Sequence, residues 1–123
     1  MKTSLRVYAK KEEKPVFIKV VTEHSNSLTY DQFGNYAVQV GMENWPKEEC
    51  QGIFKELSLD LAELSIQKFS SNVIERVMEK GQMPVVLEYI DILLDGDNLE
   101  YVAASYYGFY VLERILNLLK QGD

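Results

Sequence analysis

Three segments of this chain of 123 residues align with one another at a nearly constant spacing. The segment from Leu28 to Gln39 matches the segment from Leu64 to Glu75 at an offset of 36 residues. A third copy runs from Val102 to Glu113 at a further offset of 38, and we expect an Asp-Gly-Asp loop at residues 95–97 to absorb the added length. A period between about 20 and 50 residues is typical of repeat proteins, in which each unit buries its apolar side against the next. The sequence therefore predicts three tandem units that fill nearly the whole chain.

Apolar residues in each unit recur with the spacing of two helices. In the first unit, the stripe of the first helix follows Pro15 and consists of Val16, Phe17, Val20, Val21 and His24. In the second unit it consists of Ile53, Phe54, Leu57, Leu61 and Leu64. The second helices share one register, with apolar residues at 37, 38, 41 and 42, at 73, 74, 77 and 78, and at 111, 112, 115 and 116. Gly81 and Pro84 separate the second unit from the third, and no segment alternates with the period of two that marks a strand. These patterns predict an all-α solenoid of helical pairs.

The spacing also predicts the boundaries of the units. We expect them at approximately 15–46, 47–83 and 84–123, and we expect residues 1–14 to form a tail or the remnant of a preceding unit. Several side chains are expected to serve packing or structure and not chemistry. These are Phe33, Phe69 and Tyr107 between units, Trp45 over a turn, Cys50 as a small buried residue, and His24.

The composition excludes several classes of protein. Lys and Arg number 13 against 19 Asp and Glu, a net charge of −6, so the chain is not a uniformly basic nucleic-acid binder. The single cysteine can form no disulfide within the chain, which favours a reducing compartment. With one histidine, one cysteine and no glycine-rich phosphate loop, spacing offers no catalytic residue, metal site or cofactor site, so we do not expect an enzyme. The longest segment without a formal charge, Tyr101 to Leu112, is too short to cross a membrane.

One polar arc of each second helix carries a triplet of residues at equivalent positions. A rotation of about 100° per residue puts the triplet on one arc and the apolar stripe on another. The triplets are Asn35, Tyr36 and Gln39 in the first unit, Ser71, Asn72 and Glu75 in the second, and Phe109, Tyr110 and Glu113 in the third. Stacked units are expected to align the triplets into a ladder.

Two of these helices resemble a known family. The strings Asp-Gln-Phe-Gly-Asn-Tyr-Ala-Val-Gln at 31–39 and Lys-Phe-Ser-Ser-Asn-Val-Ile-Glu at 68–75 are similar to the base-reading helices of Pumilio-type (PUF) RNA-binding proteins. The resemblance covers roughly residues 15–119, and the longer gap before the third unit is like the spacing between the last two repeats of that family. It implies a right-handed α-solenoid that binds single-stranded RNA, each repeat presenting two side chains to the edge of one base and a third that stacks between bases. The edge residues are then Asn35 and Gln39, Ser71 and Glu75, and Phe109 and Glu113, and the stacking residues are Tyr36, Asn72 and Tyr110.

The edge residues of the first two units suit two different bases. Uracil offers acceptor, donor and acceptor along its pairing edge, and the amides of Asn35 and Gln39 can supply the donors and an acceptor. Guanine offers two adjacent donors, which the carboxylate of Glu75 can accept while the small Ser71 avoids crowding. Adenine would leave Glu75 desolvated and half satisfied, at a cost of roughly 1–3 kcal/mol. Since the family binds RNA antiparallel to the protein, the implied word is 5′-N-G-U-3′.

The third unit departs from this pattern, because Phe109 forms no hydrogen bond and Glu113 only accepts them. If this unit still tolerates uracil, the word is UGU, and Tyr110 retains its capacity to stack on a base. Arg76, Arg114 and Lys68 are candidates for contacts with phosphates or for stacking on bases. Acidic residues share the same face, so we expect affinity to depend on stacking and base edges.

The resemblance implies a role as well. It implies post-transcriptional control through 3′ untranslated regions of messenger RNA in the cytoplasm, with protein repressors or deadenylase machinery as partners, whereas a smaller branch of the family acts on ribosomal RNA in the nucleolus. Family domains usually stack eight repeats, so the chain is expected to be a fragment resembling the C-terminal part of an array, or to self-associate through its exposed ends. The alternative function is a protein-interaction scaffold, which the acidic balance and the altered third triplet favour.

Overall fold

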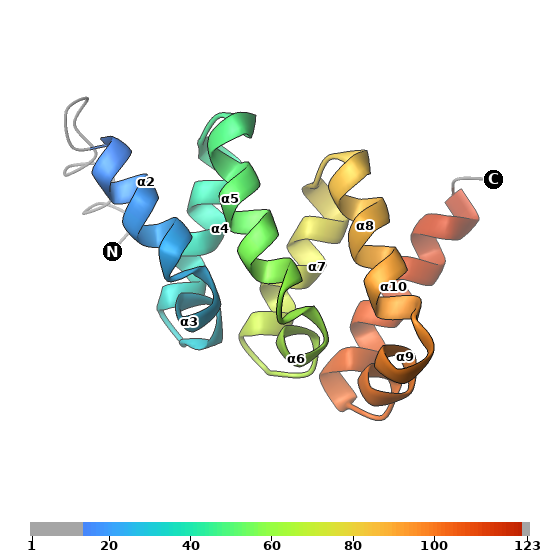
Figure 1. Cartoon of the computed structure of the whole chain (residues 1–123). Helices are drawn as coiled ribbons and strands as arrows, with labels where there is room; N and C mark the ends of the chain where they lie inside the picture. Colours follow the sequence, from blue (N-terminus) through green and yellow to red (C-terminus); the bar gives the residue numbers. More distant parts are fainter. Residues whose placement is uncertain (1–13, 122–123) are drawn as a thin grey trace.

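The computed structural model describes residues 14–121 of the chain, and every regular element within them is a helix. The helices are α2 (Lys14–Glu23), α3 (Ser25–Tyr30), α4 (Gly34–Asn44), α5 (Lys47–Ser58), α6 (Leu61–Ser65), α7 (Ser70–Lys80), α8 (Met83–Leu94), α9 (Gly96–Ala103) and α10 (Tyr106–Gln121). Figure 1 shows three similar sets, α2–α4, α5–α7 and α8–α10, side by side in a row. The predicted all-α fold is confirmed for this part of the chain. The tail or repeat remnant expected at 1–14 lies outside the described residues, apart from Lys14, where α2 begins.

Each set holds three helices, so the predicted helical pairs are wrong. A short helix, α3, α6 or α9, lies between the two longer ones because the backbone leaves the helical conformation before it. Asp60 has φ −133° and ψ 32°, and Asp95 is extended with φ −60° and ψ 137°. The added length of the third unit extends α9 to 8 residues, against 6 in α3 and 5 in α6, and does not form the expected loop at 95–97.

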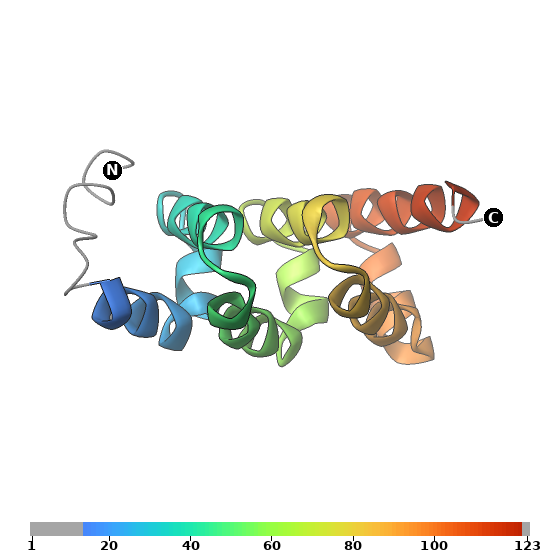
Figure 2. The same ribbon diagram turned by 90° about the horizontal axis from the view of Figure 1, so that it is seen from above.

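The long helices form two layers. Figure 2 shows α4, α7 and α10 in one layer and α2, α5 and α8 in the other. Side chains of both layers and of the short helices close one continuous core, whose fully buried members include Val38, Ile53, Leu57, Leu64, Val73, Ile74, Leu93, Val102, Val111 and Ile115. The predicted apolar stripes of α5, α6 and α7 are confirmed as buried. None of the described helices combines the length and the apolar character needed to span a bilayer.

For the two helices at the ends of the row, α2 and α10, the predicted apolar stripes are only partly buried, so these predictions are partly wrong. In α2 the core takes Ile18 and Val21, while Val16 and Val20 are 64% and 50% exposed. In α10 the stripe ends with Leu116, which is 58% exposed. Both helices have a neighbouring set on one side only among the described residues, so part of their apolar surface has nothing to pack against.

Some of the side chains that the sequence predicts to be packing residues are buried, and others are exposed. Cys50 is 3% exposed, as predicted, and Trp45 packs edge-on against Phe17 with ring centroids 6.2 Å apart. Phe33, however, is 57% exposed and is not a core residue, because it lies in the turn just before α4. His24 lies in the exposed bend between α2 and α3.

Hydrogen bonds connect neighbouring sets. The Tyr89 hydroxyl of α8 donates to the Phe54 carbonyl oxygen of α5 at 2.6 Å, and Asn26 Nδ2 donates to the Glu56 carbonyl oxygen at 3.0 Å. The Tyr30 hydroxyl, at the end of α3, donates to Oδ2 of Asp60, just before α6, at 2.7 Å. Each neighbouring pair of sets is therefore joined by polar contacts as well as by the apolar core.

Candidate nucleic-acid interface

The helices that carry the three triplets begin in the same way. An added Cβ at Gly34 would lie 2.6 Å from the carbonyl oxygen of Leu28 in the preceding short helix. An added Cβ at Gly108 would likewise clash with the carbonyl oxygen of Val102. The equivalent residue of α7, Ser70, instead donates its hydroxyl to the Leu64 carbonyl oxygen at 2.6 Å. The first turn of each helix is thus fixed against the preceding short helix, and the triplet follows directly after it.

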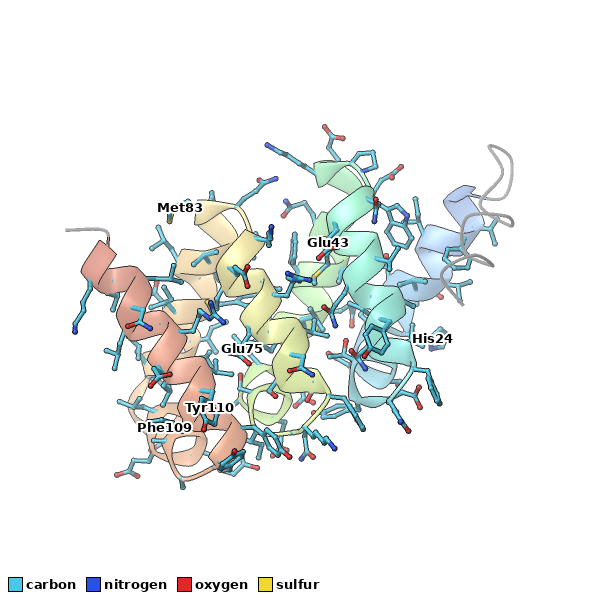
Figure 3. All side chains as sticks on the ribbon, turned by 180° about the vertical axis from the view of Figure 1, so that it is seen from behind. His24, Glu43, Glu75, Met83, Phe109 and Tyr110 are labelled. Atoms are coloured by element: carbon cyan, nitrogen blue, oxygen red, sulfur yellow. The ribbon has the colours of Figure 1, made fainter. Side chains whose placement is uncertain are left out.

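Figure 3 looks onto α4, α7 and α10 from the side that carries the triplets, with Glu75, Phe109 and Tyr110 labelled. We call this side the reading face and define it by the nine triplet residues: Asn35, Tyr36, Gln39, Ser71, Asn72, Glu75, Phe109, Tyr110 and Glu113. In the described fold α4 packs on α7 and α7 packs on α10, so the three triplets lie on consecutive neighbouring helices.

The first triplet is internally hydrogen bonded. Asn35 is only 2% exposed, and its Nδ2 donates to the carbonyl oxygens of Asp31 at 2.8 Å and of Gln32 at 2.9 Å. Its Oδ1 accepts a hydrogen bond from Gln39 Nε2 at 3.0 Å. Asn35 must therefore release a backbone carbonyl before it can donate to a base, and in this structure it orients Gln39. The amide of Gln39 still has a second N–H and its carbonyl oxygen to offer, a donor and an acceptor side by side, while Tyr36 is 53% exposed beside it.

The second triplet lines a groove between α7 and α10. Ser71 is 3% exposed and donates its hydroxyl to the Lys68 carbonyl oxygen at 3.2 Å, whereas Asn72 is exposed and Glu75 is half-buried. The groove has a volume of about 350 Å³ and is lined by Lys68, Ser71, Asn72, Glu75, Tyr106, Tyr107 and Tyr110. The structure thus brings a carboxylate, a hydroxyl and an amide of one unit opposite aromatic rings of the next. Such a groove offers polar groups of α7 and aromatic rings of α10 to the same ligand.

Only one residue of the third triplet, Tyr110, lines this groove. Phe109 and Tyr110 are 54% and 42% exposed, with ring centroids 5.6 Å apart. Tyr106 lies on the other side of Tyr110, at 5.3 Å between centroids. Tyr110 reaches the groove, but the lining of the groove includes neither Phe109 nor the exposed Glu113. The neighbouring Tyr106 hydroxyl raises the pKa of Tyr110 above its ordinary value of 10.0.

Two of the three candidate cations are paired with carboxylates of the preceding unit. Arg76 Nε lies 2.9 Å from Glu43 Oε1. The guanidinium of Arg114 lies 3.7 Å from Glu75 Oε1 and 3.9 Å from Glu79 Oε2. Lys68 Nζ is placed over the Phe69 ring, 5.5 Å from its centroid. The positive charge of the reading face is therefore largely balanced by acidic neighbours, in line with the low net charge of the chain.

Sequence reasoning missed Glu43, Glu79 and Tyr106. The signal for the two glutamates was available, since they are 36 residues apart and each lies four residues after an edge residue. Tyr106 lies four residues before Tyr110 and so shares its side of the helix. The residues that the structure describes include no group of acidic, histidine or cysteine side chains that could hold a metal ion.

Known proteins contain repeats similar to those of this chain. The family model of the Pumilio-family RNA binding repeat matches residues 24–58 and 60–93, more than half of the chain. The chain belongs to the Pumilio family of RNA-binding repeats. The family is one of RNA-binding repeats and not of enzymes.

Individual relatives agree with this assignment. Pumilio homolog 9 of Arabidopsis thaliana is 32% identical over 103 residues, which cover 81% of this chain and 17% of that protein. Pumilio homology domain family member 4 of Saccharomyces cerevisiae is 36% identical over 107 residues, which cover 80% of this chain and 12% of that protein. A double mutant of Puf4, solved bound to a Cox17 RNA 3′ untranslated-region recognition sequence, is 28% identical with a TM-score of 0.77, over 91% of this chain and 36% of that one.

The Pumilio-family match concerns only part of each relative. The chain spans 19% of the length of Pumilio homolog 12 of Arabidopsis thaliana. A structure of PUF-8 in complex with PBE-RNA has the same fold, with a TM-score of 0.78 and 22% identity, over 88% of this chain and 33% of that one.

Proposed function

We propose that this chain binds single-stranded RNA along α4, α7 and α10, one base per repeat, and reads 5′-N-G-U-3′. The observation that carries the proposal is the groove in which Ser71, Asn72 and Glu75 face the tyrosines of α10. A flat polar ligand fits this arrangement, because its faces can stack on the rings while its edge meets the carboxylate.

Guanine at the second repeat is the best-supported base. The carboxylate of Glu75 offers two adjacent acceptors, which match the two adjacent N–H donors on the guanine edge. Adenine presents no such pair and would leave the half-buried carboxylate without partners. At the first repeat, the donor and acceptor of Gln39 suit uracil, with Asn35 holding the amide in place.

The third repeat contributes stacking and little base discrimination. The ring of Tyr110 stands exposed at the groove, and neither Phe109 nor Glu113 can donate a hydrogen bond to a base. The first base of the word is therefore written as N. Should uracil still be preferred there, the complete word is UGU.

The proposal includes a biological role. Structures similar to this chain include the Puf4 RNA-binding domain bound to the HO endonuclease RNA 3′ untranslated-region recognition sequence and PUF-8 in complex with PBE-RNA. By analogy, the protein acts in the cytoplasm on 3′ untranslated regions of messenger RNA and recruits repressor or deadenylase partners. Crosslinking of the protein to RNA in cells should recover messenger 3′ untranslated regions that contain GU words. Recovery of ribosomal RNA with nucleolar staining would instead assign it to the ribosomal-RNA branch.

The binding proposal is tested by fluorescence anisotropy with short labelled RNAs. The oligomer 5′-CCUGUCC-3′ should bind more tightly than 5′-CCUAUCC-3′ by about 5- to 150-fold, the equivalent of roughly 1–3 kcal/mol for an unsatisfied half-buried carboxylate. Glu75→Gln should lose this preference. Glu88→Gln, an exposed glutamate of the other helical layer, is the matched control and should keep it. Equal binding to both oligomers by the unaltered chain would refute the proposal and leave the protein-interaction scaffold as the better account.

A further inference from the structure

Ion pairs between consecutive repeats form a regular series on the reading-face helices. Glu43 and Glu79 lie four residues after the edge residues of the first and second repeats, and Arg76 and Arg114 lie directly after the edge residues of the second and third. Arg76 pairs with Glu43 at 2.9 Å, and Arg114 pairs with Glu79 at 3.9 Å. The same contact therefore joins the first repeat to the second and the second to the third. Figure 3 labels Glu43 on α4, the carboxylate of the first step, and Glu75 on the neighbouring α7.

The two steps differ in one respect. Arg114 also lies 3.7 Å from Oε1 of Glu75, the edge residue of the second repeat. The equivalent edge residue of the first repeat, Gln39, is neutral, so Arg76 has no second carboxylate at that position. Arg114 is thus held between two carboxylates, and one of them is the group assigned to guanine.

We propose that Arg114 is a positioning residue for guanine recognition by Glu75. This inference rests on the proposed function. It means that the base specificity of the second repeat depends on a side chain of the third repeat.

Two physical effects support the inference. A free glutamate side chain samples several rotamers, and an ion pair from α10 restricts Glu75 to those in which Oε1 faces Arg114. The carboxylate has about four lone-pair positions on its two oxygens, so one cation leaves acceptors for both guanine N–H groups. The guanidinium also offsets a negative charge that would otherwise repel the RNA backbone. Since the side chains of Arg114 and Glu75 are 42% and 26% exposed, water weakens this pair only in part.

The test compares matched glutamine variants in the same anisotropy assay. Arg114→Gln is expected to lower the ratio of affinities for 5′-CCUGUCC-3′ and 5′-CCUAUCC-3′ by about 2- to 5-fold, the effect of an ion pair at a partly exposed site. Arg76→Gln removes the equivalent inter-repeat contact and should leave this ratio unchanged. Glu79→Gln removes the other partner of Arg114, and it too should leave the ratio unchanged because the contact with Glu75 remains.

A merely structural role predicts a different pattern. If Arg114 only holds two repeats together, then Arg114→Gln, Arg76→Gln and Glu79→Gln should alter stability alike and none should alter the guanine ratio. An unchanged ratio in Arg114→Gln would overturn the inference while leaving the proposed function in place. Loss of the ratio in Glu79→Gln as well would also overturn it. A lack of guanine preference in the unaltered chain would refute the proposed function and the inference with it. Arg114→Lys, which keeps a single charge near Glu75, should retain part of the ratio.

Discussion

Tyr89 offers a direct measure of how firmly the second and third repeats are joined. It is 1% exposed, and its hydroxyl donates to the Phe54 carbonyl oxygen at 2.6 Å across the interface between α8 and α5. Tyr89→Phe removes this hydrogen bond and keeps the ring. Because Phe54 lies within α5, its carbonyl remains in the hydrogen-bond ladder of that helix, and the cost should be near the net worth of one bond, about 1 kcal/mol. For a domain of this size, that corresponds to a fall in Tm of roughly 3–6 °C.

The same residue predicts a dependence on pH. Burial raises the pKa of Tyr89 above its ordinary value of 10.0. Because the pKa is raised in the folded state, the contribution of Tyr89 to the free energy of unfolding is fully present below about pH 10. Above that pH this free energy falls by up to about 1.4 kcal/mol per pH unit. Tyr89→Phe lacks this group. The difference in unfolding free energy between the unaltered chain and the variant should therefore shrink between pH 10 and pH 11.

Urea unfolding followed by circular dichroism measures both effects. The control is Tyr101→Phe, since Tyr101 is 46% exposed and its hydroxyl pairs with the carboxylate of Glu63 in solvent. This control should change the free energy of unfolding by less than about 0.5 kcal/mol. Equal losses in the two variants, or an unchanged midpoint for Tyr89→Phe at neutral pH, would refute the view that the buried hydroxyl joins the repeats.

Three further outcomes are expected. Gly108→Ala should lower the free energy of unfolding by about 1–3 kcal/mol, because the added Cβ would clash with the Val102 carbonyl oxygen. Gly96→Ala is the control and should leave this free energy unchanged, because its added Cβ would have no neighbouring atom within 4 Å. Urea unfolding measures both variants. Tyr110→Ala should weaken RNA binding by about 5- to 150-fold through lost stacking without lowering Tm, as anisotropy and thermal melting will show. With both arginines of the reading-face helices paired to carboxylates, the slope of log K against log salt should lie between 0 and about −2; a slope steeper than about −4 would contradict this pairing.

The features of the fold that follow from the repeated sequence were predictable. The offset of the repeats and the shared register of α4, α7 and α10 are enough for an all-α row of units. The short middle helices were not predictable, because the apolar spacing from Ile53 to Leu64 continues across the bend at Asp60 as though one helix ran through it. The buried side of α2 was not predictable either. Nearly every position between Val16 and Val21 is apolar, so only the neighbouring helices decide which side chains are buried.

The reading face was predictable for the same reason, and its internal contacts were not. Each triplet recurs at the same place in its unit, so comparison of the units reveals it without a structure. The hydrogen bond from Gln39 to Asn35 and the ion pair from Arg114 to Glu75 depend on side-chain directions and on the distance between neighbouring helices. A linear pattern of residues contains neither quantity. The groove between α7 and α10 likewise required coordinates, because Tyr106 belongs to no triplet.

Burial of one side of α4, α7 and α10 leaves the last residue of each triplet on the other side. Gln39, Glu75 and Glu113 each lie two residues before a buried residue, which is Gly41, Val77 or Ile115. Two residues correspond to about 200° of rotation, so each of these three edge residues lies nearly opposite a buried residue of its helix. The buried residues and these three edge residues can therefore vary independently. This separation explains how the third repeat keeps a fully buried Val111 and Ile115 and yet carries Phe109 and Glu113 where the first repeat has two amides.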